Sequence, residues 1–239
     1  MAQFGALWVG RPLTKIQIIG LSSFAHYGHD VYLYVYDDTL EVPVGITKRD
    51  AREIMPEESL FTVRDSYAAF SDIFRYHMIK KTGLAWVDAD VICTTSDWEF
   101  KDNIYCSKEL ETNIATGSVL SMPADSEAIE FLIKESEAFD KKRITWVEIG
   151  PALVDKAFKK YGLSEYIYDY HVFCGIGYSQ WYWFWRPEHL EDMLKIEKIS
   201  KAISICNFMC TVNSINKNEL PEGTAIKYFY DKFYKGMTV

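Results

Sequence analysis

The stretch from Leu84 to Ile92 is apolar except for two aspartates, Asp88 and Asp90. A continuous apolar run is typical of a strand that is buried on both faces of a parallel sheet. Burying an unpaired carboxylate is costly, so we expect both acids where the strand leaves the sheet, which in open α/β sheets is a ligand crevice. There an Asp-x-Asp pair can offer oxygens to a hard divalent cation that also binds water and substrate phosphates. The alternative is an edge strand or loop with two solvated acids.

A helix is predicted directly upstream, over residues 66–81, because apolar side chains recur there at helical spacing and Gly83 can end it. Asp72 and Arg75 lie three positions apart, so they share one face of this helix, apart from the apolar stripe. They form either a surface ion pair worth less than about 1 kcal/mol or a polar pair that faces the same crevice as the two strand aspartates.

The residues of this helix and strand resemble a known family. The segment Phe70–Tyr76 (FSDIFRY), followed by Gly83 and then Trp86–Val91 (WVDADV), is similar to the DXD-containing sugar transferases with a GT-A fold. That group includes capsule-type glycosyltransferases, initiating α-mannosyltransferases and, more distantly, the large glucosylating toxins. Leu7–Gly10 resembles the family's opening Trp-x-Gly element, and Phe24–Asp38 resembles its second strand.

The resemblance implies a fold and a division of the chain. The expected fold is α/β, GT-A-like (Rossmann-like), with a mixed, mostly parallel sheet flanked by helices. Residues 1–239 would form a single domain, which a chain of this length can fill with one core. About residues 1–100 would bind the nucleotide sugar and metal, and about 101–239 would bind the acceptor.

The resemblance also implies a chemistry, which is metal-dependent transfer of a sugar from a UDP- or GDP-sugar to a saccharide or lipid-linked acceptor. Retention of anomeric configuration is expected, without a committed nucleophile. The implied cofactor is Mn²⁺ or Mg²⁺. The expected catalytic residues are Asp72, Arg75 and Asp88. The residues expected to bind the donor are Trp8, Val9, Ser71, Asp72, Arg75, Asp88, Ala89 and Asp90, and those expected to bind the metal are Asp88, Asp90 and Asn207.

One element departs from the family pattern. Where the family has Ile-His-x-Trp-Asn, this chain has Ile203–Asn207 with Ser204 and Cys206 in place of the His and Trp. The third contact to metal or phosphate is therefore in doubt, and a non-catalytic nucleotide-sugar binding protein is one alternative. A phosphohydrolase of the aspartyl-phosphate type is another, since it also carries Asp-x-Asp after a strand, although there the motif opens the fold.

Composition excludes some partners. A net charge of −8 argues against nucleic acid, which calls for clustered Lys and Arg. Five scattered cysteines without a signal peptide indicate reduced thiols and a cytoplasmic protein. No apolar run is long enough to span a membrane.

The aromatic run Trp181–Trp185 could be an acceptor platform, a peripheral membrane or partner contact, or part of the core.

The other expected elements follow from periodicity and turn signals. Strands are predicted at 6–9, 31–36 and around 114–122. Helices are predicted at 13–25, at 48–54, after Asp125-Ser126, within 146–161 with Pro151 in the first turn, and near the C-terminus up to about Tyr234.

Overall fold

The computed structural model describes residues 1–10, 12–140 and 148–234, so the start of the segment 146–161, in which a helix is predicted, lies outside the described residues. A seven-stranded sheet in the order β3-β2-β1-β4-β7-β6-β8 forms its centre. These strands are β1 (Gln3–Trp8), β2 (Asp30–Val35), β3 (Ile46–Asp50), β4 (Ala85–Val87), β6 (Tyr105–Lys108), β7 (Ala115–Ser121) and β8 (Ile167–Tyr168).

The sheet is mixed and mostly parallel. Strands β3, β2, β1 and β4 are parallel neighbours, β7 is antiparallel to both β4 and β6, and β8 is parallel to β6. The predicted α/β class with helices flanking such a sheet is therefore confirmed.

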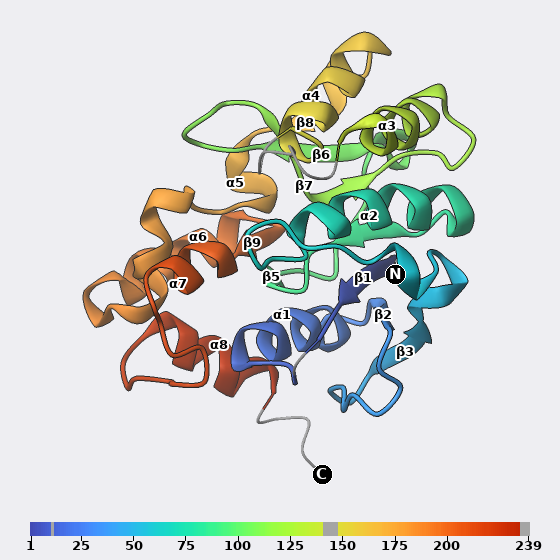
Figure 1. Ribbon diagram of the computed structural model, residues 1–239. Coiled ribbons are helices and arrows are strands. Elements are labelled where there is room, and N and C mark those ends of the chain that lie inside the picture. Colours follow the sequence, from blue (N-terminus) through green and yellow to red (C-terminus); the bar gives the residue numbers. More distant parts are fainter. Residues whose placement is uncertain (11, 141–147, 235–239) are drawn as a thin grey trace.

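Helices cover both faces of the sheet (Figure 1). The elements α2 (Ala68–Thr82), α3 (Glu127–Ala138) and α4 (Pro151–Lys160) lie on one face, and α1 (Lys15–His26) lies on the other. Alternation along β1 fits these two layers, because Leu7 belongs to the core cluster of α2 and Phe4 and Ala6 belong to the cluster of α1.

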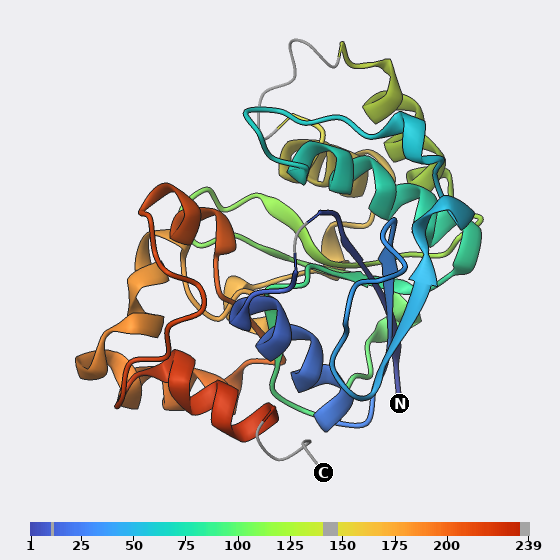
Figure 2. The ribbon, with the colours of Figure 1, turned by 60° about the horizontal axis from the view of Figure 1, so that its bottom comes forward.

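The C-terminal segments pack against α1 and a small second sheet, as the orange-to-red ribbons show in Figures 1 and 2. Their helices are α5 (Tyr170–Phe173), α6 (Leu190–Ile199), α7 (Asn207–Val212) and α8 (Ala225–Phe233). The second sheet pairs the C-terminal strand β9 (Ala202–Ser204) with β5 (Val91–Cys93), which follows β4 in the chain. A third core cluster joins Ile16 and Ile19 of α1 to Phe229 and Phe233 of α8. Short 3-10 helices span Ala51–Glu53, Glu57–Ser59, Lys101–Asn103, Ser164–Tyr166, Tyr178–Trp185 and Pro187–His189.

Most predicted elements are present within a few residues of their expected bounds. Helix α2 ends at Gly83, which has the left-handed φ of 70° that glycine favours, and Ser126 caps α3 by accepting a hydrogen bond from the Ile129 backbone. Pro151 opens α4.

The helix predicted at 48–54 is wrong. Residues up to Asp50 extend β3, which pairs in register with β2, and only Ala51–Glu53 is helical. Thr47–Asp50 are all exposed in this edge strand, so the apolar alternation that would predict a strand is absent.

The run from Leu84 to Ile92 forms two strands where one was predicted. Strand β4 belongs to the large sheet, whereas β5 pairs with β9, and the connection Asp88–Asp90 lies between them. The acids do lie where the chain leaves the sheet, as predicted.

The aromatic run Trp181–Trp185 mainly builds core. Phe184 is fully buried, and Trp181, Trp183 and Trp185 pack against the third core cluster. Tyr182 is 40% exposed. The membrane or partner contact of this segment stays a prediction. Within the described residues, no helix combines the length and apolar character that crossing a bilayer requires.

Candidate functional site

The sheet has a topological switch point between β1 and β4. From β1 the chain moves outward through β2 to β3, and it then returns to the other side of β1 at β4. Ligands of open α/β sheets bind outside the carboxyl ends of the strands at such a reversal. Trp8 is the last residue of β1 and Asp88 directly follows β4, so two predicted site residues meet the ligand edge.

The connection Asp88–Asp90 is held by its backbone. The amide of Asp88 donates to the Ser118 carbonyl at 2.8 Å, and the carbonyl of Asp90 accepts from the Ile205 amide at 3.0 Å. Helix α1 packs so closely here that a Cβ on Gly20 would lie 2.3 Å from the Ala89 carbonyl oxygen. The two carboxylates therefore project from a fixed turn.

Arg75 joins the two acids nearest to it. Its Nη2 lies 3.0 Å from Asp72 Oδ1 and 3.1 Å from Asp88 Oδ1, which also accepts a 2.7 Å hydrogen bond from the Trp86 indole. The Arg75 side chain is 6% exposed, and those of Asp72 and Asp88 are 10% and 31% exposed. The structure thus brings the predicted helix pair into contact with Asp88, which is the most exposed of these three side chains.

The cluster carries excess negative charge. Burial raises the pKa of Asp72 to about 6 against the opposing effect of Arg75, and burial together with Asp88 raises the pKa of Asp90 to about 6. Burial also raises the pKa of Asp88 despite its contacts with Arg75 and Trp86. The charges of three carboxylates act here against the buried Arg75 guanidinium and, at Asp90, against Lys217, so one negative charge is left that a divalent cation would neutralise.

Asp90 also anchors the start of α7. Its Oδ2 accepts a 2.8 Å hydrogen bond from the backbone amide of Asn207, the first residue of that helix. The side chain of Asn207 is used elsewhere, because its Oδ1 accepts a 2.6 Å hydrogen bond from Lys217, which also donates to Thr211. Lys217 was not found from the sequence, since it lies in a polar segment ten residues beyond Asn207 with no motif around it.

The donor set fits a cation that shares its coordination with substrate. Asp88 Oδ2 and Asp90 Oδ1 are not used in the contacts above, whereas the Asn207 oxygen is occupied by Lys217. In the part of the chain that the structure describes, no three Asp, Glu, His or Cys side chains gather as a metal cage. Mg²⁺ in phosphate-transferring sites is held in this way, by one or two carboxylates together with water and phosphate oxygens.

The remaining predicted donor residues lie at the end of β1 or next to the acids in the sequence. Trp8 and Val9 are half-buried at the end of β1, with Trp8 packed against the α1-side core. Ser71 is half-buried next to Asp72, and Ala89 is buried between the two aspartates. Their roles in binding stay predictions.

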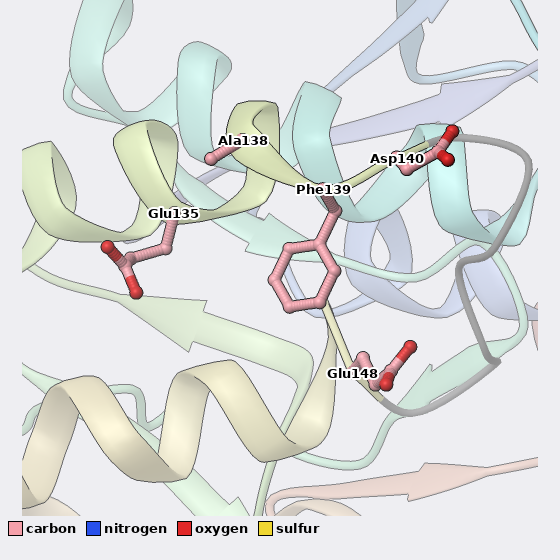
Figure 3. Close-up of a pocket in the computed structure, with 5 residues that line it drawn as sticks. All are labelled: Glu135, Ala138, Phe139, Asp140 and Glu148. Carbon is pink, nitrogen blue, oxygen red and sulfur yellow. The ribbon is translucent and has the colours of Figure 1, made fainter.

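A separate cavity of about 350 Å³ lies at the end of α3 (Figure 3). Its lining residues are Glu135, Ala138, Phe139, Asp140 and Glu148. The Phe139 ring points between the acidic side chains in the close-up. None of the acids around Arg75 contributes to it, so it is distinct from the switch-point site.

Comparison with known proteins gave structural matches only. Neither a protein-family model nor a curated protein matches the sequence. The PaToxG glycosyltransferase aligns with a TM-score of 0.49 and 12% identity over 99% of this chain and 85% of its own. The apo form of glycosyltransferase GlyE from Streptococcus pneumoniae TIGR4 has a TM-score of 0.48 and 10% identity over 97% of this chain and 63% of its own. The bifunctional glycosyltransferase WbbM, in its apo structure, has a TM-score of 0.41 and 9% identity over 95% of this chain and 51% of its own. At these scores the similarity assigns no function, which has to come from the site.

Proposed function

We propose that this protein is a metal-dependent glycosyltransferase that uses a nucleotide-diphosphate sugar. The observation that supports this most is the contact of Arg75 with both Asp72 and Asp88 at the switch point of a mostly parallel sheet, near Asp90 in the chain. The sequence resemblance of these same residues to DXD-containing sugar transferases agrees with this use.

Different residues of this chain would bind different parts of the donor. Arg75 would donate to hydroxyls of the donor sugar and Asp72 would accept from them, which orients the anomeric carbon. Trp8 would stack on the base at the end of β1. Asp88 and Asp90 would hold Mn²⁺ or Mg²⁺, which when bound neutralises the charge that develops on the departing diphosphate. The sugar would then be transferred, with retention of its anomeric configuration, to a saccharide or lipid-linked acceptor in the cytoplasm.

One observation favours a second candidate, a nucleotide-sugar binding protein without transferase activity. Asn207 is tied to Lys217, and Ser204 and Cys206 stand where the family has His and Trp, so the third contact to the diphosphate is missing from its usual residues. Such a protein would bind the donor and Mn²⁺ but release no nucleotide diphosphate.

Thermal shift against a panel of UDP- and GDP-sugars tests the donor class. We expect at least one of them to raise the melting temperature when Mn²⁺ is present and to have little effect in a chelator, because a ligand that binds only the folded state stabilises it. The absence of any shift across the panel with Mn²⁺ would rule out both a transferase and a binder.

Stabilisation by Mn²⁺ is expected to be larger at about pH 7.5 than at about pH 5. The pKa of the expected metal ligand Asp90 is raised to about 6, so below that pH this acid holds a proton that a cation must displace. The pKa of the neighbouring Asp72 is also raised to about 6. In the metal-free protein these acids resist ionisation, so their contribution to stability falls as pH rises from the usual Asp pKa to about 6. Melting temperatures with and without Mn²⁺ at both pH values check this, and equal shifts would contradict it.

Replacing Asn207 with alanine is expected to leave Mn²⁺ affinity nearly unchanged, whereas Asp88→Asn should lower it strongly. The Asn207 side chain bonds Lys217, and it is only the backbone amide, which alanine keeps, that bonds Asp90. Titration of Mn²⁺ by calorimetry in the presence of UDP or GDP measures both variants. A loss in Asn207→Ala equal to that in Asp88→Asn would instead make Asn207 a metal ligand.

A further inference from the structure

Two glycines press against the buried Asp72–Arg75 pair. A Cβ on Gly117, in strand β7, would lie 2.3 Å from Arg75 Nη1. A Cβ on Gly150, directly before α4, would lie 2.7 Å from Asp72 Oδ2 and 3.0 Å from its carboxyl carbon. Both distances are too short for non-bonded atoms, so either side chain requires something to move.

The charged pair has little freedom to move away. The Arg75 guanidinium is held by two carboxylates and lies 5.1 Å from the centre of the Trp86 ring. Its Nε is also buried, and it has no hydrogen-bond partner among the described residues.

The backbone beside Gly150 is fixed from the same helix that carries the pair. The Tyr76 hydroxyl, one position after Arg75 in α2, donates a 2.7 Å hydrogen bond to the Ile149 carbonyl. Ile149 is itself fully buried against Ala69 and Ile73 of α2. The start of α4 therefore cannot easily retreat from Asp72.

We propose that Gly117 and Gly150 are positioning residues for the donor sugar. Their bare backbones leave the space that the guanidinium and the carboxylate fill, so they fix where both groups meet the sugar. This inference rests on the proposed function. It also implies that the chain beyond residue 100 shapes the donor site as well as the acceptor side. A displacement of about 1 Å in such a site can cost about 100-fold in rate.

The first test is the effect of Gly117→Ala on sugar transfer. We expect kcat to fall about 100-fold, while the thermal shift produced by UDP or GDP with Mn²⁺ is kept, because Asp90 and Trp8 are unaffected and Asp88 keeps its charge and its hydrogen bond from Trp86. Gly177→Ala is the matched control: its Cβ would lie 2.3 Å from Glu111 Oε1, but Glu111 is exposed and outside the site, so kcat should not change. An unchanged kcat in Gly117→Ala would overturn the inference.

The second test does not depend on transferase activity, and it can be carried out even if Gly117→Ala fails to fold. Gly150→Ala is expected to lower the melting temperature of the wild-type protein and to lower it less than half as much in an Asp72→Ala background, where the carboxylate is gone. Equal losses in both backgrounds would overturn the role of Gly150. If the losses differ but no nucleotide sugar binds the wild-type protein, the proposed function fails while the steric role of the glycine stands.

Discussion

Replacing Asp90 with asparagine is expected to lower the rate of sugar transfer by about 100- to 1,000-fold and to remove the thermal shift caused by Mn²⁺. Asparagine can still accept the hydrogen bond from the Asn207 amide, so the start of α7 is kept. It lacks the negative charge that a cation needs next to Asp88. Initial rates over a series of Mn²⁺ concentrations, with melting temperatures of the same samples, measure both effects.

Asp97→Asn is the control for this charge change. Asp97 is exposed and pairs with Lys201 on the surface, so its neutralisation should leave the rate and the Mn²⁺ shift as in the wild-type protein. An Asp90→Asn protein that keeps its rate and its response to Mn²⁺ would show that the cation is held elsewhere.

Replacing Arg75 with methionine is expected to lower the free energy of unfolding at about pH 7.5 by about 3–5 kcal/mol, because removing one partner of a buried ion pair leaves the other charge unpaired. Asp72 and Asp88 would lose the cation that each contacts. The loss should be smaller at about pH 5, since the pKa of Asp72 is already raised to about 6 and protonation there removes its charge. Urea unfolding at the two pH values gives both numbers.

The matched control is Lys156→Met, which breaks an exposed pair with Glu135 at 3.1 Å. Such pairs contribute at most about 1 kcal/mol, with little dependence on pH between these values. A loss in Arg75→Met as small as that in Lys156→Met would mean that Arg75 does not neutralise the acids around it.

Local sequence predicted the central part of the fold because burial there leaves a pattern. The apolar run interrupted at Asp88 and the helical spacing around Asp72 both reflect which residues face the core, and the structure places them as expected. The pattern failed at β3, an edge strand whose exposed residues need no apolar alternation. It also did not show that the run splits at Asp88–Asp90 into two different sheets.

The parts of the site that sequence could not predict come from distant segments. Lys217 reaches Asn207 across a loop, and Gly117 and Gly150 meet the charged pair only through tertiary packing. A glycine needed for close approach looks like any other glycine in a single sequence. The contact of Arg75 with Asp72 and Asp88 could be predicted from the sequence, since the spacing of these residues and the family resemblance both indicate it.

The most direct test of the account is release of free nucleotide diphosphate from the UDP- or GDP-sugar that binds. With wild-type protein and Mn²⁺ we expect the diphosphate to accumulate over time, to stop on addition of a chelator, and to be nearly absent with Asp90→Asn. Binding of the donor without any release would reduce the protein to a nucleotide-sugar binder, and release that continues in Asp90→Asn with a chelator present would contradict the metal site at Asp88 and Asp90.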